Sequence, residues 1–277
     1  MKVPKCIVLD IDGTLINDSK QIQRFTRNEL HRVVDDFGVQ VSLVSARMPS
    51  SIRRVIRQLG IDASYSAYSG CFICTGGKER WLGSLPASLV KRTVEAAWLK
   101  DRLHIGVFSL DSWYVREVDY WSLREARGTG VWPQISALSE ITSSVVAGSP
   151  IHKVMFRGQP SDLRSLIESE QLIGNPEVTL QLSETALELY PADVSKLNSV
   201  RALASESGNS LDDVMAFGDS DSDAEMIARS GVGVAMSNAS DLAKSEAAEI
   251  TLSNNEDGVG LMIRKYFPSS SRYVDVE

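Results

Sequence analysis

The first sixty residues alternate between apolar runs and segments whose apolar residues recur at helical spacing. Residues 6–9 form an unbroken apolar run, typical of a parallel strand covered on both faces, and residues 39–44 predict a second strand. The stretches 24–37 and 49–59 each place apolar residues on one helical face and are followed by a glycine that stops the helix. This order predicts a β-α-β unit followed by another helix.

The same alternation returns near the end of the chain. Residues 197–204 and 224–229 have helical spacing, and residues 214–217 and 232–235 are short apolar runs typical of strands. We therefore expect the two ends of the chain to form halves of one α/β domain, a doubly wound, mostly parallel, Rossmann-like sheet.

The middle of the chain has a different pattern. It predicts a helix at 89–99, an antiparallel pair at 104–110 and 113–118, and strands at 153–157 and 178–182. This is an α+β pattern rather than an alternating one. We therefore predict a core domain made of residues 1–82 and 188–277, with an inserted α+β cap domain at 83–187.

Composition and charge narrow the function classes. The chain has 277 residues, 43% of them apolar, and a formal charge of −7 with basic and acidic residues interspersed. It lacks the basic footprint of a nucleic-acid-binding protein, and its longest early apolar run, residues 6–9, is too short for a signal peptide or a membrane span. We expect a cytoplasmic protein, monomeric or a small homo-oligomer, with no nucleic-acid or membrane partner.

Three cysteines give one short motif, Cys71-x-x-Cys74. Such a pair can be redox-active or form half of a zinc site. The chain has no second cysteine pair and only three histidines, and Phe72 and Ile73 between the cysteines suggest a strand. Ordinary apolar packing is therefore the better interpretation.

Two carboxylates follow the first predicted strand in the run Asp10-Ile11-Asp12-Gly13-Thr14. If the backbone stays extended, Asp10 and Asp12 point the same way, at the strand end where open α/β sheets bind ligands. A Mg²⁺ ion would relieve their repulsion and hold Asp10 against a phosphate oxygen, while Asp12 could keep a raised pKa and act as general acid and base. Alone, the run could also be an acidic turn that caps a helix or binds Ca²⁺.

Three further segments place suitable groups at strand ends. Residues 218–223 follow a predicted strand and supply Asp219 as a third metal ligand, with Asp223 binding the ion directly or through water, although such a run can also simply cap a helix. Ser45, after the second strand, offers a hydroxyl to phosphate, and Lys196, at a helix start, offers a charge. Each of these signals is weak alone, because such residues are common at surfaces.

Together, the four segments resemble the motifs of the haloacid dehalogenase superfamily, in its Cof-type, subclass IIB branch of phosphatases. The resemblance covers nearly the whole chain and implies that Asp10 is the nucleophile, Asp12 the general acid/base, and Ser45 and Lys196 the phosphate ligands. It also implies Mg²⁺, held by Asp10, Asp219 and the backbone carbonyl of Asp12, with an inserted cap. The residues expected to contact phosphate are Ile11, Asp12, Gly13, Ser45, Ala46, Lys196 and Ser222. Asn238, in the segment after the fourth motif, is a peripheral candidate.

Two positions depart from the family pattern. Ala46 replaces the usual glycine and narrows the approach of backbone to phosphate, and Ser222 replaces an asparagine and has a shorter reach. Both substitutions could weaken phosphate or metal binding.

The function expected is Mg²⁺-dependent hydrolysis of a small phosphorylated metabolite, a sugar phosphate by resemblance, through a phospho-aspartate on Asp10. A phosphomutase and a non-catalytic Mg²⁺- and phosphate-binding regulatory module remain alternatives. In the cap, tryptophans and arginines could bind the leaving group, although core filling and solvation explain most of them better. These residues are Trp98, Trp113, Trp121, Trp132, Arg116, Arg124 and Arg127.

Overall fold

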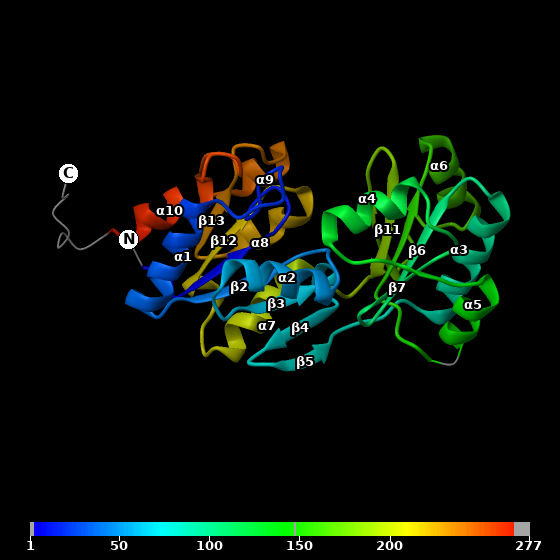
Figure 1. Ribbon diagram of the computed structural model, residues 1–277, viewed down its shortest axis with the longest axis horizontal. Coiled ribbons are helices and arrows are strands. Elements are labelled where there is room, and N and C mark those ends of the chain that lie inside the picture. The colour runs from blue at the N-terminus through cyan, green and yellow to red at the C-terminus, as the bar shows by residue number, and fades with distance from the viewer. Residues whose placement is uncertain (1–2, 147, 269–277) are drawn as a thin grey trace.

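The computed structural model describes residues 3–146 and 148–268, which form two lobes, each built on one sheet (Figure 1). The first sheet has eight strands in the order β14-β13-β12-β1-β2-β3-β4-β5, and the second has six in the order β10-β11-β9-β6-β7-β8. Strands of the first sheet come from both ends of the chain, whereas the second sheet uses only residues between them. The prediction of an α/β core sheet with an α+β insertion is confirmed.

The first sheet is parallel over its inner strands, and only the β3-β4-β5 edge is antiparallel. Its strands are β1 Cys6–Leu9, β2 Gln40–Val44, β3 Ser64–Ala67, β4 Phe72–Thr75, β5 Lys78–Trp81, β12 Val214–Gly218, β13 Val232–Ala235 and β14 Glu249–Ile250. Its helices are α1 Arg24–Phe37, α2 Pro49–Leu59, α7 Lys196–Glu206, α8 Ala224–Arg229, α9 Asp241–Glu246 and α10 Gly258–Tyr266, with 3-10 turns η1 Tyr68–Gly70, η2 Leu211–Asp213 and η3 Asp221–Asp223.

Both faces of this sheet are buried, which explains why β1 is apolar throughout. Ile7 and Leu9 pack into a cluster with residues of α1, α2 and α10, whereas Cys6 and Val8 pack on the other face with residues of α7. Alternate side chains of a strand point to opposite faces, so a strand between two helical layers needs apolar residues at every position.

Helix boundaries follow local sequence signals. Pro49 is at the first position of α2, and Gly38 and Gly60 follow α1 and α2 in the left-handed conformation that ends a helix. The predicted limits of α1 and α2, and those of α8, β9, β10 and β13, agree with the structure.

The second sheet is antiparallel except for the short β7-β8 pair. Its strands are β6 His104–Ser109, β7 Ser112–Val115, β8 Gln134–Ile135, β9 Lys153–Arg157, β10 Val178–Leu182 and β11 Ala186–Pro191. Its helices are α3 Ala87–Lys100, α4 Tyr120–Thr129, α5 Leu138–Val146 and α6 Pro160–Ser169. Helices α3, α5 and α6 lie on one side of this sheet, and α4 lies on the side facing the first lobe (Figure 1).

The domain limits remain our proposal, with one adjustment. The predicted return to the core domain at residue 188 falls inside β11, which pairs with β10 as far as Pro191. We therefore propose that the chain crosses back after Pro191. The sequence signal for β11 was missed because Ala186–Pro191 contains a charged residue, Glu188, among its apolar ones.

Two other expectations can be compared with the structure. Cys71 lies in the apolar core and burial raises the pKa of its thiol, while Cys74 is half-buried on β4, in keeping with ordinary packing. None of the helices within residues 3–146 and 148–268 combines the length and the apolar character needed to cross a bilayer.

Candidate active site

The candidate site lies at the carboxyl ends of three adjacent parallel strands. β1 ends at Leu9 and is paired with β2 on one side and β12 on the other. Asp10, Ser45 and Asp219 are the first residues after these strands. Parallel pairing therefore brings together residues that are more than two hundred positions apart.

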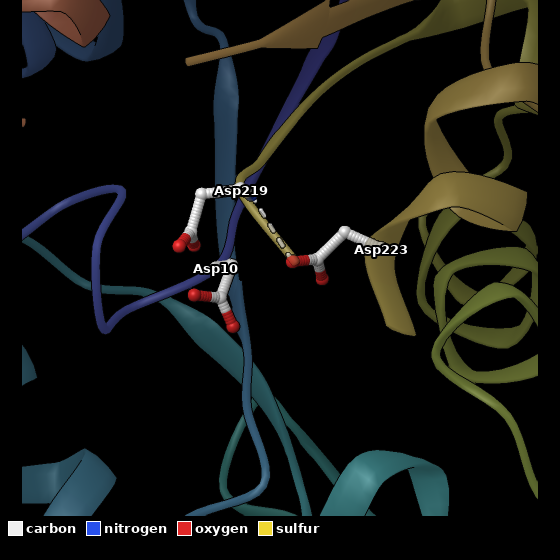
Figure 2. A group of neighbouring side chains, drawn as sticks. All are labelled: Asp10, Asp219 and Asp223. Carbon is white, nitrogen blue, oxygen red and sulfur yellow. Dashed lines mark hydrogen bonds between the residues drawn. The ribbon is translucent and has the colours of Figure 1, made fainter. Parts of the chain in front are cut away.

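Three carboxylates gather there and point toward a common space (Figure 2). One oxygen from each of Asp10, Asp219 and Asp223 lies within 4.8 Å of the other two. Asp10 and Asp223 are buried and Asp219 is half-buried. Clustered hard oxygen ligands of one charge sign fit a divalent cation such as Mg²⁺ or Ca²⁺.

The electrostatics of the cluster also favour a cation. Burial raises the pKa of Asp10 well above its ordinary value, and the charges of Asp223 and Asp219 raise it further, against the opposing effect of Lys196. Burial, followed by the charge of Asp223, raises the pKa of Asp219 to about 6. The protein thus holds these carboxylates in an arrangement that disfavours their charged forms unless positive charge is supplied.

Lys196 supplies part of that charge. It is the first residue of α7, its side chain is 4% exposed, and its Nζ donates to Oδ1 of Asp10 at 2.7 Å and to Oδ1 of Asp223 at 2.6 Å. Burial lowers its pKa, but the two carboxylates outweigh this and raise it, so the ammonium stays charged. In the sequence, its position at a helix start offered only a weak signal that could equally describe a surface lysine, and the family resemblance strengthened it.

Asp223 has a second set of partners that fix its orientation. Its Oδ2 accepts from the backbone N–H of Asp219 and Ser220, at 3.2 and 3.0 Å, and from the Ser220 hydroxyl at 2.7 Å. The helix-capping interpretation of this acidic run is thus correct for Asp223, which also belongs to the carboxylate cluster. Because its two oxygens accept from Lys196 and from the backbone of Asp219 and Ser220, Asp223 can fix the positions of these groups as well as bind a cation.

Gly13 is required by its surroundings. Its φ of +77° is in the left-handed region, and a Cβ there would lie 2.3 Å from Oδ2 of Asp219. The turn is also held by Thr14, whose hydroxyl donates to Oδ1 of Asp219 at 3.0 Å, and by Asn238, whose side-chain amide donates to the carbonyl of Gly13 at 2.9 Å. Thr14 was not singled out from sequence, although it directly follows the acidic motif.

The structure corrects two expectations about Asp12. The backbone does not stay extended, because the chain turns at Ile11, where Leu15 and Ile16 donate back to the Ile11 carbonyl. The pKa of Asp12 is not raised: partial burial raises it, but hydrogen bonds and charge from Arg47 and Lys20 outweigh burial and lower it to about 2. Asp12 is therefore a carboxylate in this structure. Whether its backbone carbonyl binds a metal stays a prediction.

Arg47 is a residue of this site that was not singled out from the sequence. Its side chain is 9% exposed and grips Asp12 with two parallel bonds, Nε to Oδ2 at 2.6 Å and Nη2 to Oδ1 at 2.7 Å. Lys20 adds a third bond to Oδ1 at 2.8 Å. The available signal was the position of Arg47 two residues after Ser45, at the same sheet edge as Asp12.

The remaining predicted phosphate ligands are distributed around this edge. Ser45 is buried, and its hydroxyl accepts from the backbone N–H of Arg47 at 3.2 Å. The hydroxyl of Ser222 lies 2.8 Å from that of Ser220. Ser45, Ala46, Ser222, Asp10, Asp12 and Lys196 all line one cavity of about 1130 Å³. Roles for the backbone of Ile11 and Gly13 stay predictions.

That cavity is shared by the two lobes. Its other wall comes from the second sheet and α4, including Arg124, Lys153, Arg157 and Glu188. Of the cap tryptophans, Trp113 is buried, Trp132 is exposed, and Trp121 is half-buried. The arrangement can therefore hold a phosphate against the carboxylate cluster and enclose the rest of a small molecule between the lobes.

Comparison with known proteins agrees with this geometry. The chain is 28% identical over 267 residues to the 5-amino-6-(5-phospho-D-ribitylamino)uracil phosphatase YcsE of Bacillus subtilis, covering 95% of each chain. It is 27% identical to the chloroplastic endoribonuclease YBEY of Arabidopsis thaliana over 94% of this chain, but it spans only 46% of that protein.

A solved structure and a family model extend the match. The crystal structure of a haloacid dehalogenase-like hydrolase from Bacteroides thetaiotaomicron superposes with a TM-score of 0.83 at 27% identity, covering 95% of this chain and 99% of the other. The family model of haloacid dehalogenase-like hydrolases matches residues 7–263, a span that contains every carboxylate of the cluster. Fold, strand-end carboxylates and sequence thus agree that the chain belongs to the haloacid dehalogenase-like hydrolase family.

Proposed function

We propose that the protein is a Mg²⁺-dependent phosphatase that hydrolyses a small phosphate monoester through a phospho-aspartate on Asp10. The observation that carries this proposal is the position of Asp10, which lines the shared cavity, accepts a hydrogen bond from Lys196, and has an oxygen within 4.8 Å of oxygens of two further carboxylates. A nucleophilic carboxylate beside a cation-binding cluster is the arrangement that phosphoryl transfer through aspartate needs.

In the first step, an oxygen of Asp10 attacks phosphorus and the bond to the leaving-group oxygen breaks. Asp12 is the residue we assign to proton transfer, and its pKa near 2 makes it a carboxylate before substrate enters. An anionic phosphate placed beside it would raise that pKa and let Asp12 carry the proton that the leaving oxygen takes up. In the second step, the Asp12 carboxylate removes a proton from water, which attacks the phospho-aspartate and regenerates Asp10.

Lys196, Ser45 and neighbouring groups would bind the phosphate. The Lys196 ammonium is held at the Asp10 carboxylate, so it can neutralise phosphate charge during attack. The Ser45 hydroxyl lines the same cavity, with Ala46 and Ser222 beside it. Bound at Asp10 and Asp219, with Asp223 adjacent, Mg²⁺ would offset the charge of the carboxylates and of the phosphate.

A small metabolite, most simply a sugar phosphate, is the substrate class we propose. The cavity of about 1130 Å³ is large enough for such a molecule and is lined by residues of both lobes. YcsE, whose name specifies a phosphorylated ribityl compound, matches this chain over 95% of each sequence. We also propose that the protein is cytoplasmic, because small phosphorylated metabolites occur in that compartment.

The test is phosphate release from a panel of phosphorylated metabolites, measured with Mg²⁺, with EDTA, and with Mg²⁺ restored. Asp10→Asn should abolish turnover while preserving the fold, because the amide is nearly isosteric but a far poorer nucleophile. Asp212→Asn is the matched control: Asp212 is exposed near the opposite end of β12 and should leave activity unchanged.

Retained activity in Asp10→Asn would remove Asp10 from its assigned role. Isomerised sugar phosphate without free phosphate would show a phosphomutase instead. Labelling of one phosphate per chain without further turnover would show a non-catalytic phosphate-binding module.

A further inference from the structure

The two faces of the second sheet differ: one carries charged side chains and the other carries apolar ones. Lys153 and Arg157 are four residues apart on β9, so they point to the same face, and Glu188 on β11 pairs with Met155 between them. The alternate residues Val154 and Phe156 point the opposite way and pack in the cluster formed with α3 and α6. The charged face is the one that lines the cavity shared with the candidate active site.

The cations that line this cavity differ in whether they already have a carboxylate partner. Among residues 3–146 and 148–268, six lysines and arginines line it, and four of these are hydrogen-bonded to carboxylates. Those four are Lys196 with Asp10, Arg47 and Lys20 with Asp12, and Lys153 with Glu188 at 2.9 Å. Arg124 and Arg157 are the remaining two.

Within the part of the chain that the structure describes, neither Arg157 nor Arg124 has a carboxylate within hydrogen-bond distance, although both side chains contact Trp121. The nearest carboxylate to Arg157 is that of Glu125, 3.7 Å from its Nη2, which is too long for a hydrogen bond. Arg124 has no ion pair within residues 3–146 and 148–268. Both guanidinium groups lie over the ring of Trp121, at 5.7 Å for Arg157 and 5.9 Å for Arg124, which orients them while leaving their donors free.

We propose that Arg124 and Arg157 bind a second oxyanion, so that the preferred substrate is a phosphate monoester whose leaving group itself carries a phosphate or a carboxylate. This inference rests on the proposed phosphatase function and specifies its substrate class. Guanidinium groups match the paired oxygens of carboxylate and phosphate, and two adjacent like charges are stabilised when an anion lies between them.

A neutral polyol fits this wall less well. Hydroxyl groups need acceptors as well as donors. Glu188 already accepts from Lys153 through Oε1 and from Tyr190 through Oε2 at 2.6 Å, and Glu125, the other acid on this wall, lies 3.7 Å from Arg157. Hydroxyl oxygens could accept from Arg124 and Arg157, but they carry no negative charge, so Glu125 would remain the one acid within ion-pair distance of either guanidinium among the described residues. An anionic leaving group fits this wall better. Its oxygens accept hydrogen bonds from the two arginines, and it has no need for Glu188 as an acceptor.

The experiment compares kcat/KM for three substrates with one skeleton: a hexose 6-phosphate, the corresponding hexose 1,6-bisphosphate, and the corresponding 6-phosphoaldonate. The wild-type enzyme should prefer at least one anionic substrate over the neutral one by about 10-fold or more. The bisphosphate and the aldonate distinguish phosphate from carboxylate as the second group. Arg157→Gln and Arg124→Gln should each reduce this preference several-fold, and the double variant should abolish it.

Two further variants separate recognition from folding. Arg157→Lys keeps the charge but loses the fork, so it should retain part of the preference. Arg164→Gln is the matched control, because Arg164 is exposed on α6, on the opposite side of the second sheet, and should keep the wild-type preference. Binding of each substrate to the inactive Asp10→Asn variant, measured by calorimetry, should show the same order of affinities without turnover.

Failure of this inference is distinguishable from failure of the proposed function. If the wild-type enzyme releases phosphate from all three substrates at similar kcat/KM, or favours the neutral one, the second-anion assignment is wrong while the phosphatase assignment stands. An equal loss on neutral and anionic substrates in the arginine variants would also overturn it. If no phosphate is released from any phosphate monoester, the proposed function itself fails.

Discussion

The two walls of the cavity take their side chains from different parts of a sheet: one from the ends of strands and the other mainly from a sheet face. On the first lobe, functional side chains follow the ends of parallel strands, and the two lysines and one arginine of that wall are already bonded to carboxylates. On the second lobe, side chains come from the open face of antiparallel strands and from helix α4, and one arginine from each keeps free donors.

This difference indicates that the first wall serves the reaction and the second wall serves the choice of substrate. Strand ends of a sheet covered on both faces are rigid and partly buried, which suits a reaction that needs fixed charges. A sheet face open to a cavity offers several side-chain positions that can be varied without disturbing the core behind them. Changes on the first wall should therefore affect every substrate, whereas changes on the second should affect the choice among substrates.

The largest effect is expected from Lys196→Met. It leaves two buried carboxylates without their cation and should lower the free energy of unfolding by about 3 kcal/mol in EDTA, together with loss of activity on all substrates. Denaturant unfolding measures the first and phosphate release the second. Lys91→Met, at an exposed position on α3, is the control and should change neither. A stability equal to wild type would show that the carboxylates do not depend on this lysine.

A pH effect is expected at the junction of the two lobes. Burial lowers the pKa of His152 to about 4, although its hydrogen bond to the carbonyl of Gly83 acts in the opposite direction, and its ring is stacked on Tyr68 and Trp81. Between pH 6.5 and 4 the unfolded chain therefore binds a proton that the folded protein excludes. Stability should fall as pH falls through this window, by at most about 3 kcal/mol from this residue.

The comparison is with His152→Asn, whose amide can still donate to Gly83 but cannot titrate. The variant should lose the part of the pH dependence that lies between 6.5 and 4, as measured by unfolding at several pH values. Parallel pH profiles for the two proteins would mean that His152 is not kept neutral by its position between the lobes.

A paired glycine substitution tests the geometry of the first wall. Gly13→Ala combines a positive φ with a Cβ 2.3 Å from Asp219, whereas Gly38→Ala has a similar φ of +65° and open space. Both should lose about 1 kcal/mol of stability from backbone strain. Only Gly13→Ala should also displace Asp219 and weaken Mg²⁺ activation, by about 10-fold or more. The same Mg²⁺ dependence in both variants would contradict the placement of Asp219 in the metal-binding cluster.

The smallest effect is expected where the lobes touch at Asp111, in the turn between β6 and β7. Its carboxylate accepts from the backbone N–H of Ser50 at the start of α2, at 2.7 Å, and from Arg53. Asp111→Ala should raise KM a few-fold, equally for neutral and anionic substrates, by favouring a more open arrangement of the lobes. Glu168→Ala, exposed on α6, is the control. If Asp111→Ala changed the substrate preference or left KM unchanged, the result would contradict the view that Asp111 acts only by favouring closure of the two lobes.

The sequence by itself determined the architecture and the residues of the first wall. Apolar runs such as Cys6–Leu9 predict covered parallel strands because every position of such a strand is buried, and polar residues at the strand ends must then meet at one edge. That logic predicts from the sequence that Asp10, Ser45 and Asp219 lie together, and the family resemblance adds Lys196.

Only the tertiary structure decided the charge state of Asp12 and the content of the second wall. Arg47 and Lys20 lower the pKa of Asp12, and neither contact follows from local sequence, because both depend on how the turn after β1 packs against the segment after β2. Likewise, Arg124 and Arg157 come from a helix and a strand whose spatial relation is fixed by antiparallel register and by Trp121. A pattern of hydrophobic positions fixes which faces are buried, but the partners of each charge depend on distances between segments that only the folded chain brings together.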